Sequence, residues 1–119
     1  MSHLDPLPWT PNCVSTEATS RWRRLDPLPY PEGGGREDAI ARVKAVVATF
    51  PRTELVEERG DYLHYVFSSK KMGFKDDVEF AFDDAARVVH FRSAAREGIW
   101  DLGVNRRRMK AVRRGYLAD

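Results

Sequence analysis

The chain has 119 residues, of which 42% are hydrophobic and 32% are charged, a composition that indicates one globular domain with a single core. Twenty lysines and arginines against eighteen aspartates and glutamates leave a net charge of only +2, so the overall charge does not require an anionic partner. A single cysteine, Cys13, excludes an internal disulfide and a zinc site built on cysteine pairs. No apolar run approaches the roughly 20 residues of a membrane helix. The first residues also lack the apolar core of a signal peptide, so we expect a cytoplasmic protein without a membrane span.

The first 35 residues predict an extended arm rather than regular structure. Six of the seven prolines and the run Gly33-Gly34-Gly35 lie in this segment. Its large apolar side chains, including Trp9 and Trp22, are of a kind that disordered linkers lack. We therefore predict two parts: an N-terminal arm over residues 1–35 that packs on the rest of the chain, and a domain over residues 36–119.

Beyond the arm, the apolar pattern predicts a helix, four strands and a second helix. Helical spacing covers residues 37–50 and ends before Pro51, because the residue before a proline is disfavoured in the α conformation. Period-two alternation predicts strands over residues 53–58, 61–69, 76–82 and 87–93. The last helix covers about residues 104–117, with Asp101 as its N-cap. The predicted fold class is α+β, a four-stranded antiparallel meander with two helices on one face, in the order α-β-β-β-β-α.

The same alternation sorts the strand side chains into two faces. The face toward the helices carries the predicted core residues Val56, Leu63, Tyr65, Phe67, Val78, Phe80, Phe82, Val89 and Phe91. The opposite face carries the ionisable residues His64, Asp77, Glu79, His90 and Arg92. With a four-residue turn at residues 83–86, the last hairpin places Glu79 opposite His90 and Asp77 opposite Arg92. A polar face of this kind is ordinarily solvated, but it becomes a crevice if the arm crosses it.

Imidazole and carboxylate groups on one face leave open a hydrolase or a metal-dependent enzyme. Such an enzyme would use His64, Asp77 and Glu79, with His90 as a further ligand and Cys13 as a ligand or nucleophile from the arm. These residues do not have the spacing of a metal-binding motif, so we expect no metal and no cofactor.

The last helix is strongly basic, with six lysines and arginines and no acidic residue over residues 106–114. Such a run suits a nucleic-acid backbone or an anionic membrane surface. It offers few side chains for reading base edges, so we do not expect nucleic acid. The helix dipole disfavours cations near a helix start, which indicates carboxylate partners for these arginines. The network that we expect at one corner of the sheet joins the acids of DDVEF, namely Asp76, Asp77 and Glu79, to Arg92, Arg96 and Arg106.

Seven sequence blocks carry a resemblance to a known family. They are PNCVST (11–16), PLPY (27–30), FPR (50–52), YLH (62–64), DDVEF (76–80), RSA (92–94) and DLGVNRRR (101–108). In these blocks the chain resembles the bacterial and plastid family catalogued as domain of unknown function 1499. The resemblance implies a small domain without an established activity, and it supplies no catalytic residues.

The function that we predict is a non-catalytic module that binds a small anionic ligand or another protein. The candidate residues are Cys13, His64, Asp77, Glu79, His90, Arg92, Arg96, Asp101 and Arg106. Two alternatives stay open at this point, an enzyme on the polar sheet face and a nucleic-acid or anionic-surface binder that uses the basic helix.

Overall fold

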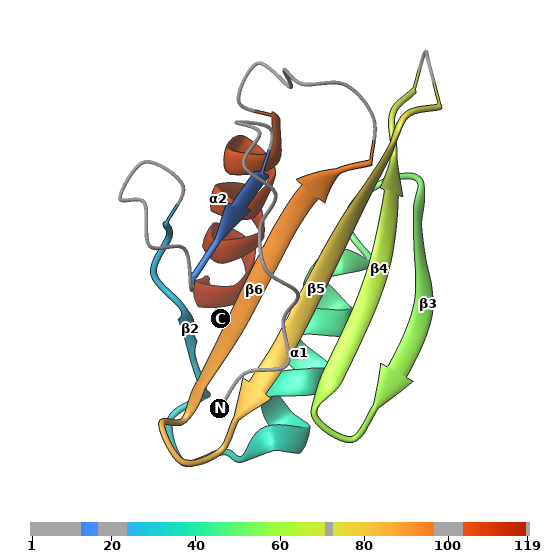
Figure 1. The fold of residues 1–119 in the computed structure, drawn as a ribbon. Coiled ribbons are helices and arrows are strands. Elements are labelled where there is room, and N and C mark those ends of the chain that lie inside the picture. Colours follow the sequence, from blue (N-terminus) through green and yellow to red (C-terminus); the bar gives the residue numbers. More distant parts are fainter. Residues whose placement is uncertain (1–12, 17–23, 71–72, 97–103, 119) are drawn as a thin grey trace.

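Two helices pack on one face of a six-stranded antiparallel sheet (Figure 1). The structure is a computed structural model that describes residues 13–16, 24–70, 73–96 and 104–118. In chain order the elements are β1 (Cys13–Ser15), β2 (Leu28–Pro29), α1 (Arg36–Val47), β3 (Thr53–Arg59), β4 (Tyr62–Ser68), β5 (Lys75–Asp83), β6 (Val88–Ala95) and α2 (Val104–Leu117). The predicted α+β class is therefore confirmed, as is the order of a helix, a four-stranded meander and a helix from residue 36 onward.

The predicted number of four strands is wrong, because the N-terminal arm adds two more. Both arm strands pair antiparallel with β6, β1 along Arg92–Ala94 and β2 along Val88–Val89. Neither shows the alternation of a strand, since they are three and two residues long. Pro29 has no N–H to donate, and proline in a sheet is confined to edges of this kind. The division into an arm and a domain stays a prediction, and Trp9 and Trp22 lie outside the described residues.

The two helices follow their predicted ranges closely. Helix α1 begins after Gly35, whose backbone N–H donates to the Asp38 carboxylate at 3.0 Å, and it ends three residues earlier than predicted. The residues after Val47 continue in tight turns, with the Phe50 N–H donating to the Val47 carbonyl at 3.0 Å. Helix α2 has the predicted bounds and buries Met109, Val112 and Tyr116.

The core lies between the helices and the inward face of the sheet. Eight of the nine predicted core residues are buried, namely Leu63, Tyr65, Phe67, Val78, Phe80, Phe82, Val89 and Phe91. The ninth, Val56, is 45% exposed, so its prediction is wrong. The cause is a β-bulge between Leu55 and Glu57, which leaves Val56 as the extra residue without a partner in β4 and shifts the side chains after it to the other face. Glu58 consequently points to the helix side, where its carboxylate meets Lys44 Nζ at 2.7 Å.

The hairpin between β5 and β6 has a different register from the predicted one. Asp83 pairs with Val88, so Glu79 lies opposite Arg92 rather than His90, and Asp77 lies opposite Ala94 rather than Arg92. The turn occupies residues 84–87 and includes Arg87 at a φ of 55°. Each partner therefore moves by two residues, which preserves the assignment of side chains to the two faces while changing every cross-strand pair.

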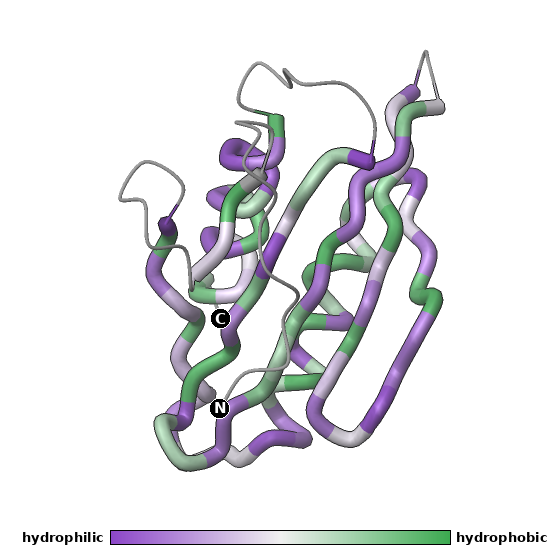
Figure 2. Tube along the Cα trace, in the orientation of Figure 1, coloured by the Kyte–Doolittle hydropathy of each residue, from purple (hydrophilic) through white to green (hydrophobic). Residues whose placement is uncertain are grey.

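Hydropathy along the trace follows this arrangement (Figure 2). The free edge of the sheet, β3, is hydrophilic over most of its length and carries Glu54, Glu57 and Glu58. Charges and a bulge on an edge strand oppose pairing with another chain. The opposite edge is covered by the arm strands, which pair with β6.

Candidate functional site

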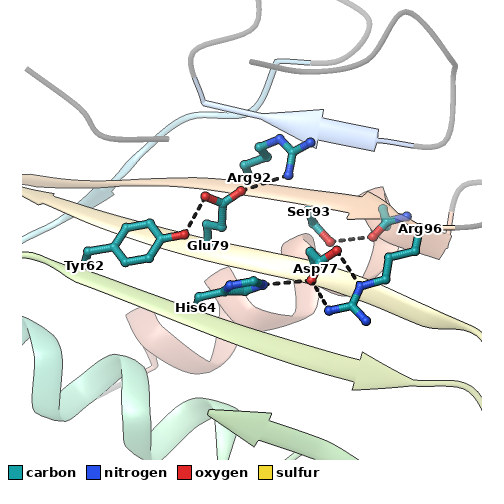
Figure 3. Close-up of polar contacts among 8 residues, drawn as sticks. Tyr62, His64, Asp77, Glu79, Arg92, Ser93 and Arg96 are labelled. Atoms are coloured by element: carbon teal, nitrogen blue, oxygen red, sulfur yellow. Dashed lines mark hydrogen bonds and ion pairs between the residues drawn. The ribbon is translucent and has the colours of Figure 1, made fainter. Parts of the chain in front are cut away.

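A carboxylate is buried at the centre of the polar sheet face. Glu79 on β5 is 2% exposed, and its two oxygens accept hydrogen bonds from Tyr62 Oη at 2.7 Å and Arg92 Nη1 at 2.8 Å (Figure 3). The Arg92 side chain is 13% exposed, and its buried Nε has no hydrogen-bond partner among the described residues. Glu79 is therefore the principal electrostatic partner that the structure gives to Arg92.

A second cluster on this face surrounds Asp77. His64 Nε2 lies 2.8 Å from Asp77 Oδ1, and Arg96 donates from Nε and Nη2 to the two carboxylate oxygens at 2.8 Å each. Burial alone raises the pKa of Asp77, but the hydrogen bonds and charges of Arg96 and His64 outweigh it and hold that pKa below 3.8. The predicted pair of Asp77 with Arg92 is thus wrong, because the shifted register gives Asp77 to Arg96 and Glu79 to Arg92.

The remaining candidates on this face do not join these clusters into a metal site. His90 lies opposite Ala81, with its Nδ1 3.1 Å from Thr16 Oγ1 and its Nε2 4.0 Å from Asp83 Oδ2. Among the described residues, no three His, Cys, Asp or Glu side chains are grouped as metal ligands would be. Cys13 pairs with Ala94 through its backbone, while its side chain and all of Asp101 lie outside the described part of the chain.

The helix face of the sheet has its own ion pair. Arg108 Nη2 on α2 lies 2.7 Å from Asp76 Oδ2, and the guanidinium stacks 5.0 Å from the centre of the Phe67 ring. A carboxylate partner for an arginine near the helix start is therefore confirmed. Asp76 and Asp77 are neighbours on one strand and project to opposite faces, so these ion pairs form on both sides of β5 rather than at one corner as predicted.

A cavity of about 310 Å³ lies between α2 and the arm segment that leads into β2. Its described lining residues are Arg24, Leu25, Asp26, Phe91, Arg106, Met109, Lys110 and Arg113. Four of these carry a positive charge and one, Asp26, a negative charge. Phe91 lies in β6 between the stretches that pair with β2 and β1, so the cavity opens on the helix side of the sheet and not on the polar face.

The side chains from α2 reach the cavity because of their spacing. Arg106, Met109, Lys110 and Arg113 stand at i, i+3, i+4 and i+7, which puts all four on one helix face. Arg113 also holds the arm in place, since its Nη1 donates to the carbonyls of Asp26 at 2.9 Å and Pro27 at 3.0 Å. Of the predicted candidates whose side chains the structure describes, only Arg106 lines this cavity.

Sequence reasoning missed Arg24, Lys110 and Arg113. The spacing of Arg106, Lys110 and Arg113 indicates that they share one face of a helix, so these residues could have been predicted from the sequence. The contribution of Arg24 could not have been predicted, because it depends on where the arm lies in space.

An α+β domain of two helices on an antiparallel sheet thus carries a buried and a partly buried carboxylate cluster on one face and a basic cavity on the other. The chain matches the family described as Protein of unknown function (DUF1499) over residues 3–115, and it belongs to that family. No curated protein and no solved structure matches it. Within the described residues, neither helix has both the length and the apolar character needed to cross a bilayer.

Proposed function

We propose that this protein is a non-catalytic module that binds a small anionic ligand in the cavity between the arm and α2. The observation that carries the proposal is the charge of the cavity lining. Among its described residues, four are basic, namely Arg24, Arg106, Lys110 and Arg113, and one, Asp26, is acidic. Guanidinium groups pair bidentately with carboxylate and phosphate oxygens, so such a lining favours an anion with several acceptor oxygens. A volume of about 310 Å³ is at the small end of ligand pockets, which range from roughly 300 to 1,000 Å³.

The polar sheet face supports an architectural role better than a catalytic one. Its carboxylates already accept hydrogen bonds from Tyr62, Arg92 and Arg96, and His64 is engaged with Asp77. A general base must reach the proton of a substrate, whereas these groups reach one another. The described cavity also lies on the other side of the sheet, so it does not bring a ligand to Glu79 or Asp77.

A continuous basic surface for nucleic acid or membrane lipid has less support. The cations of α2 are divided between different surroundings, since Arg108 is paired with Asp76 while Arg106, Lys110 and Arg113 line the cavity. Contacts along a phosphate backbone need cations on a shared exposed face. Action in the cytoplasm and binding of another protein stay predictions.

The test is the thermal stability of the protein in inorganic phosphate, compared with chloride at the same ionic strength. Because a ligand that prefers the folded state raises the melting temperature, we expect a phosphate-dependent rise in the wild-type protein. We expect Arg24→Gln and Lys110→Gln to reduce that rise. Arg113 is left intact because it also anchors the arm.

The matched control is Lys75→Gln, which removes an exposed cation from the start of β5, away from the cavity. The control should behave as the wild-type protein does. No rise in the wild-type protein, or an equal loss in all three variants, would contradict the proposal.

A further inference from the structure

We infer that the ligand of this cavity is a phosphate monoester with a short apolar body, an inference that rests on the proposed function and names the chemical class of its ligand. The reason for an apolar body is the floor of the cavity. Phe91 and Met109 belong to the hydrophobic core, and Leu25, which also lines the cavity, packs against that core from the arm. Phe91 and Met109 are 1% and 0% exposed, so the apolar surface left for a ligand to cover belongs to the partly buried Leu25, which an inorganic anion would leave in contact with water.

The cationic side chains add to the apolar wall as well as to the charge. Lysine and arginine stems are chains of methylene groups that line apolar surface while their charged ends reach toward water. Arg106, Lys110 and Arg113 rise along one face of α2, so their stems flank Met109. The cavity is thereby apolar at its base and cationic at its rim, and an amphipathic anion matches both parts.

The charged group that best suits the rim is a phosphate. Three of the four cations are arginines, whose planar guanidinium groups bond two oxygens at once. A phosphate monoester presents three acceptor oxygens and nearly two negative charges at neutral pH, and a carboxylate presents two oxygens and one charge. The phosphate therefore engages more of the rim than a carboxylate does.

The volume limits the size of the apolar body. A water molecule occupies about 30 Å³ of liquid, so about 310 Å³ corresponds to roughly ten water-sized groups. Hexyl phosphate has a comparable number of non-hydrogen atoms. The two acyl chains of a phospholipid are far larger, so the structure favours a soluble phosphate ester over a lipid headgroup.

The experiment is calorimetric titration of the full chain with inorganic phosphate and with ethyl, butyl, hexyl and octyl phosphate at one ionic strength. Burial of each methylene group is worth a factor of about three to four in affinity. We expect the affinity to rise by this factor per methylene from ethyl to hexyl phosphate and then to level off. Hexanol, which lacks the charge, should not bind measurably.

Two variants separate the apolar and the charged contributions. Leu25→Ala should flatten the increase of affinity with chain length, and it should weaken hexyl phosphate more than inorganic phosphate. Lys110→Gln should weaken every member of the series by a similar factor and leave the increase per methylene unchanged. Leu25 is only partly buried, so its truncation is compatible with a folded chain.

The outcomes distinguish this inference from the proposed function. Equal affinity for inorganic and hexyl phosphate would overturn the amphipathic ligand while leaving anion binding in place. No binding of any phosphate would overturn both. Binding to vesicles that contain phosphatidic acid, without binding to hexyl phosphate in solution, would also overturn the inference, because the ligand would then be a lipid surface.

Discussion

Glu79 carries an almost inaccessible negative charge in the middle of the sheet, and its surroundings explain how that charge is tolerated. A buried charge is costly unless it is paired and hydrogen-bonded. Tyr62 and Arg92 supply one hydrogen bond to each carboxylate oxygen, at 2.7 and 2.8 Å. The Glu79 carboxylate is in turn the partner of the Arg92 guanidinium. Removal of either Glu79 or Arg92 therefore leaves the charge of the other buried without its partner.

Glu79→Ala is therefore expected to lower the free energy of unfolding by about 3–5 kcal/mol, because it leaves the Arg92 charge buried without its partner. Urea denaturation measures this loss. The matched control is Glu57→Ala, since the Glu57 side chain is 48% exposed and pairs with Arg59 at the surface. Exposed pairs contribute about 0–1 kcal/mol. Similar losses for the two variants would show that Glu79 is not the electrostatic centre of this face.

The sequence predicts which residues share a face better than it predicts which residues touch. Period-two alternation correctly put His64, Asp77, Glu79 and Arg92 on one side, because that assignment depends only on parity. Their partners depend on the position of the turn, which occupies residues 84–87 rather than 83–86 and holds Arg87 at a φ of 55° that the sequence pattern does not indicate. Both predicted cross-strand pairs, Glu79 with His90 and Asp77 with Arg92, are therefore wrong.

At the scale of elements, the turn between β5 and β6 ties the arm and α1 to the sheet. Asp84 in this turn accepts a hydrogen bond from Tyr30 Oη at 2.6 Å, and its two oxygens lie 3.1 Å from Arg36 Nε. Tyr30 follows β2, and Arg36 opens α1. The hydrogen bonds from Arg36 and Tyr30 lower the pKa of Asp84 from 3.8 to about 2, since they favour the ionised carboxylate.

This pKa gives a prediction for acid stability with a definite sign. Because the folded state lowers the pKa of Asp84, its contribution is complete above pH 3.8 and is lost as the pH falls toward about 2. We expect the urea midpoint of the wild-type protein to fall more steeply over this window than that of Asp84→Asn. Parallel curves for the two proteins would contradict the role given to Asp84.

The elements that the sequence predicts well are those with enough residues to show a period. Both helices and the four meander strands have seven or more residues, and all of them were placed to within three residues at their ends. The arm strands were missed because β1 and β2 are too short to alternate, and their pairing with β6 comes from backbone hydrogen bonds. The basic cavity was missed because three of its eight described lining residues, Arg24, Leu25 and Asp26, come from the arm, whose position the sequence does not indicate.

At the scale of the whole molecule, the local distribution of charge is more informative than the net charge. The net charge of +2 gives little general attraction for anions. The cavity concentrates four cations against one described carboxylate, and apolar residues form its base. Anion binding is therefore expected to be a property of this one place and to weaken with salt, since its rim is open to solvent.

The most direct test of this account is a map of the binding site by nuclear magnetic resonance. The isotope-labelled chain is titrated with hexyl phosphate, and the amide shifts are followed residue by residue. We predict that the largest changes fall on residues 24–26 and on the face of α2 from Arg106 to Arg113. The β4–β5 hairpin near Lys70 and Lys75 and the region around Glu79 should be unchanged. Changes that spread over all surface cations, or that centre on Glu79, would contradict the assignment of the anion site to this cavity.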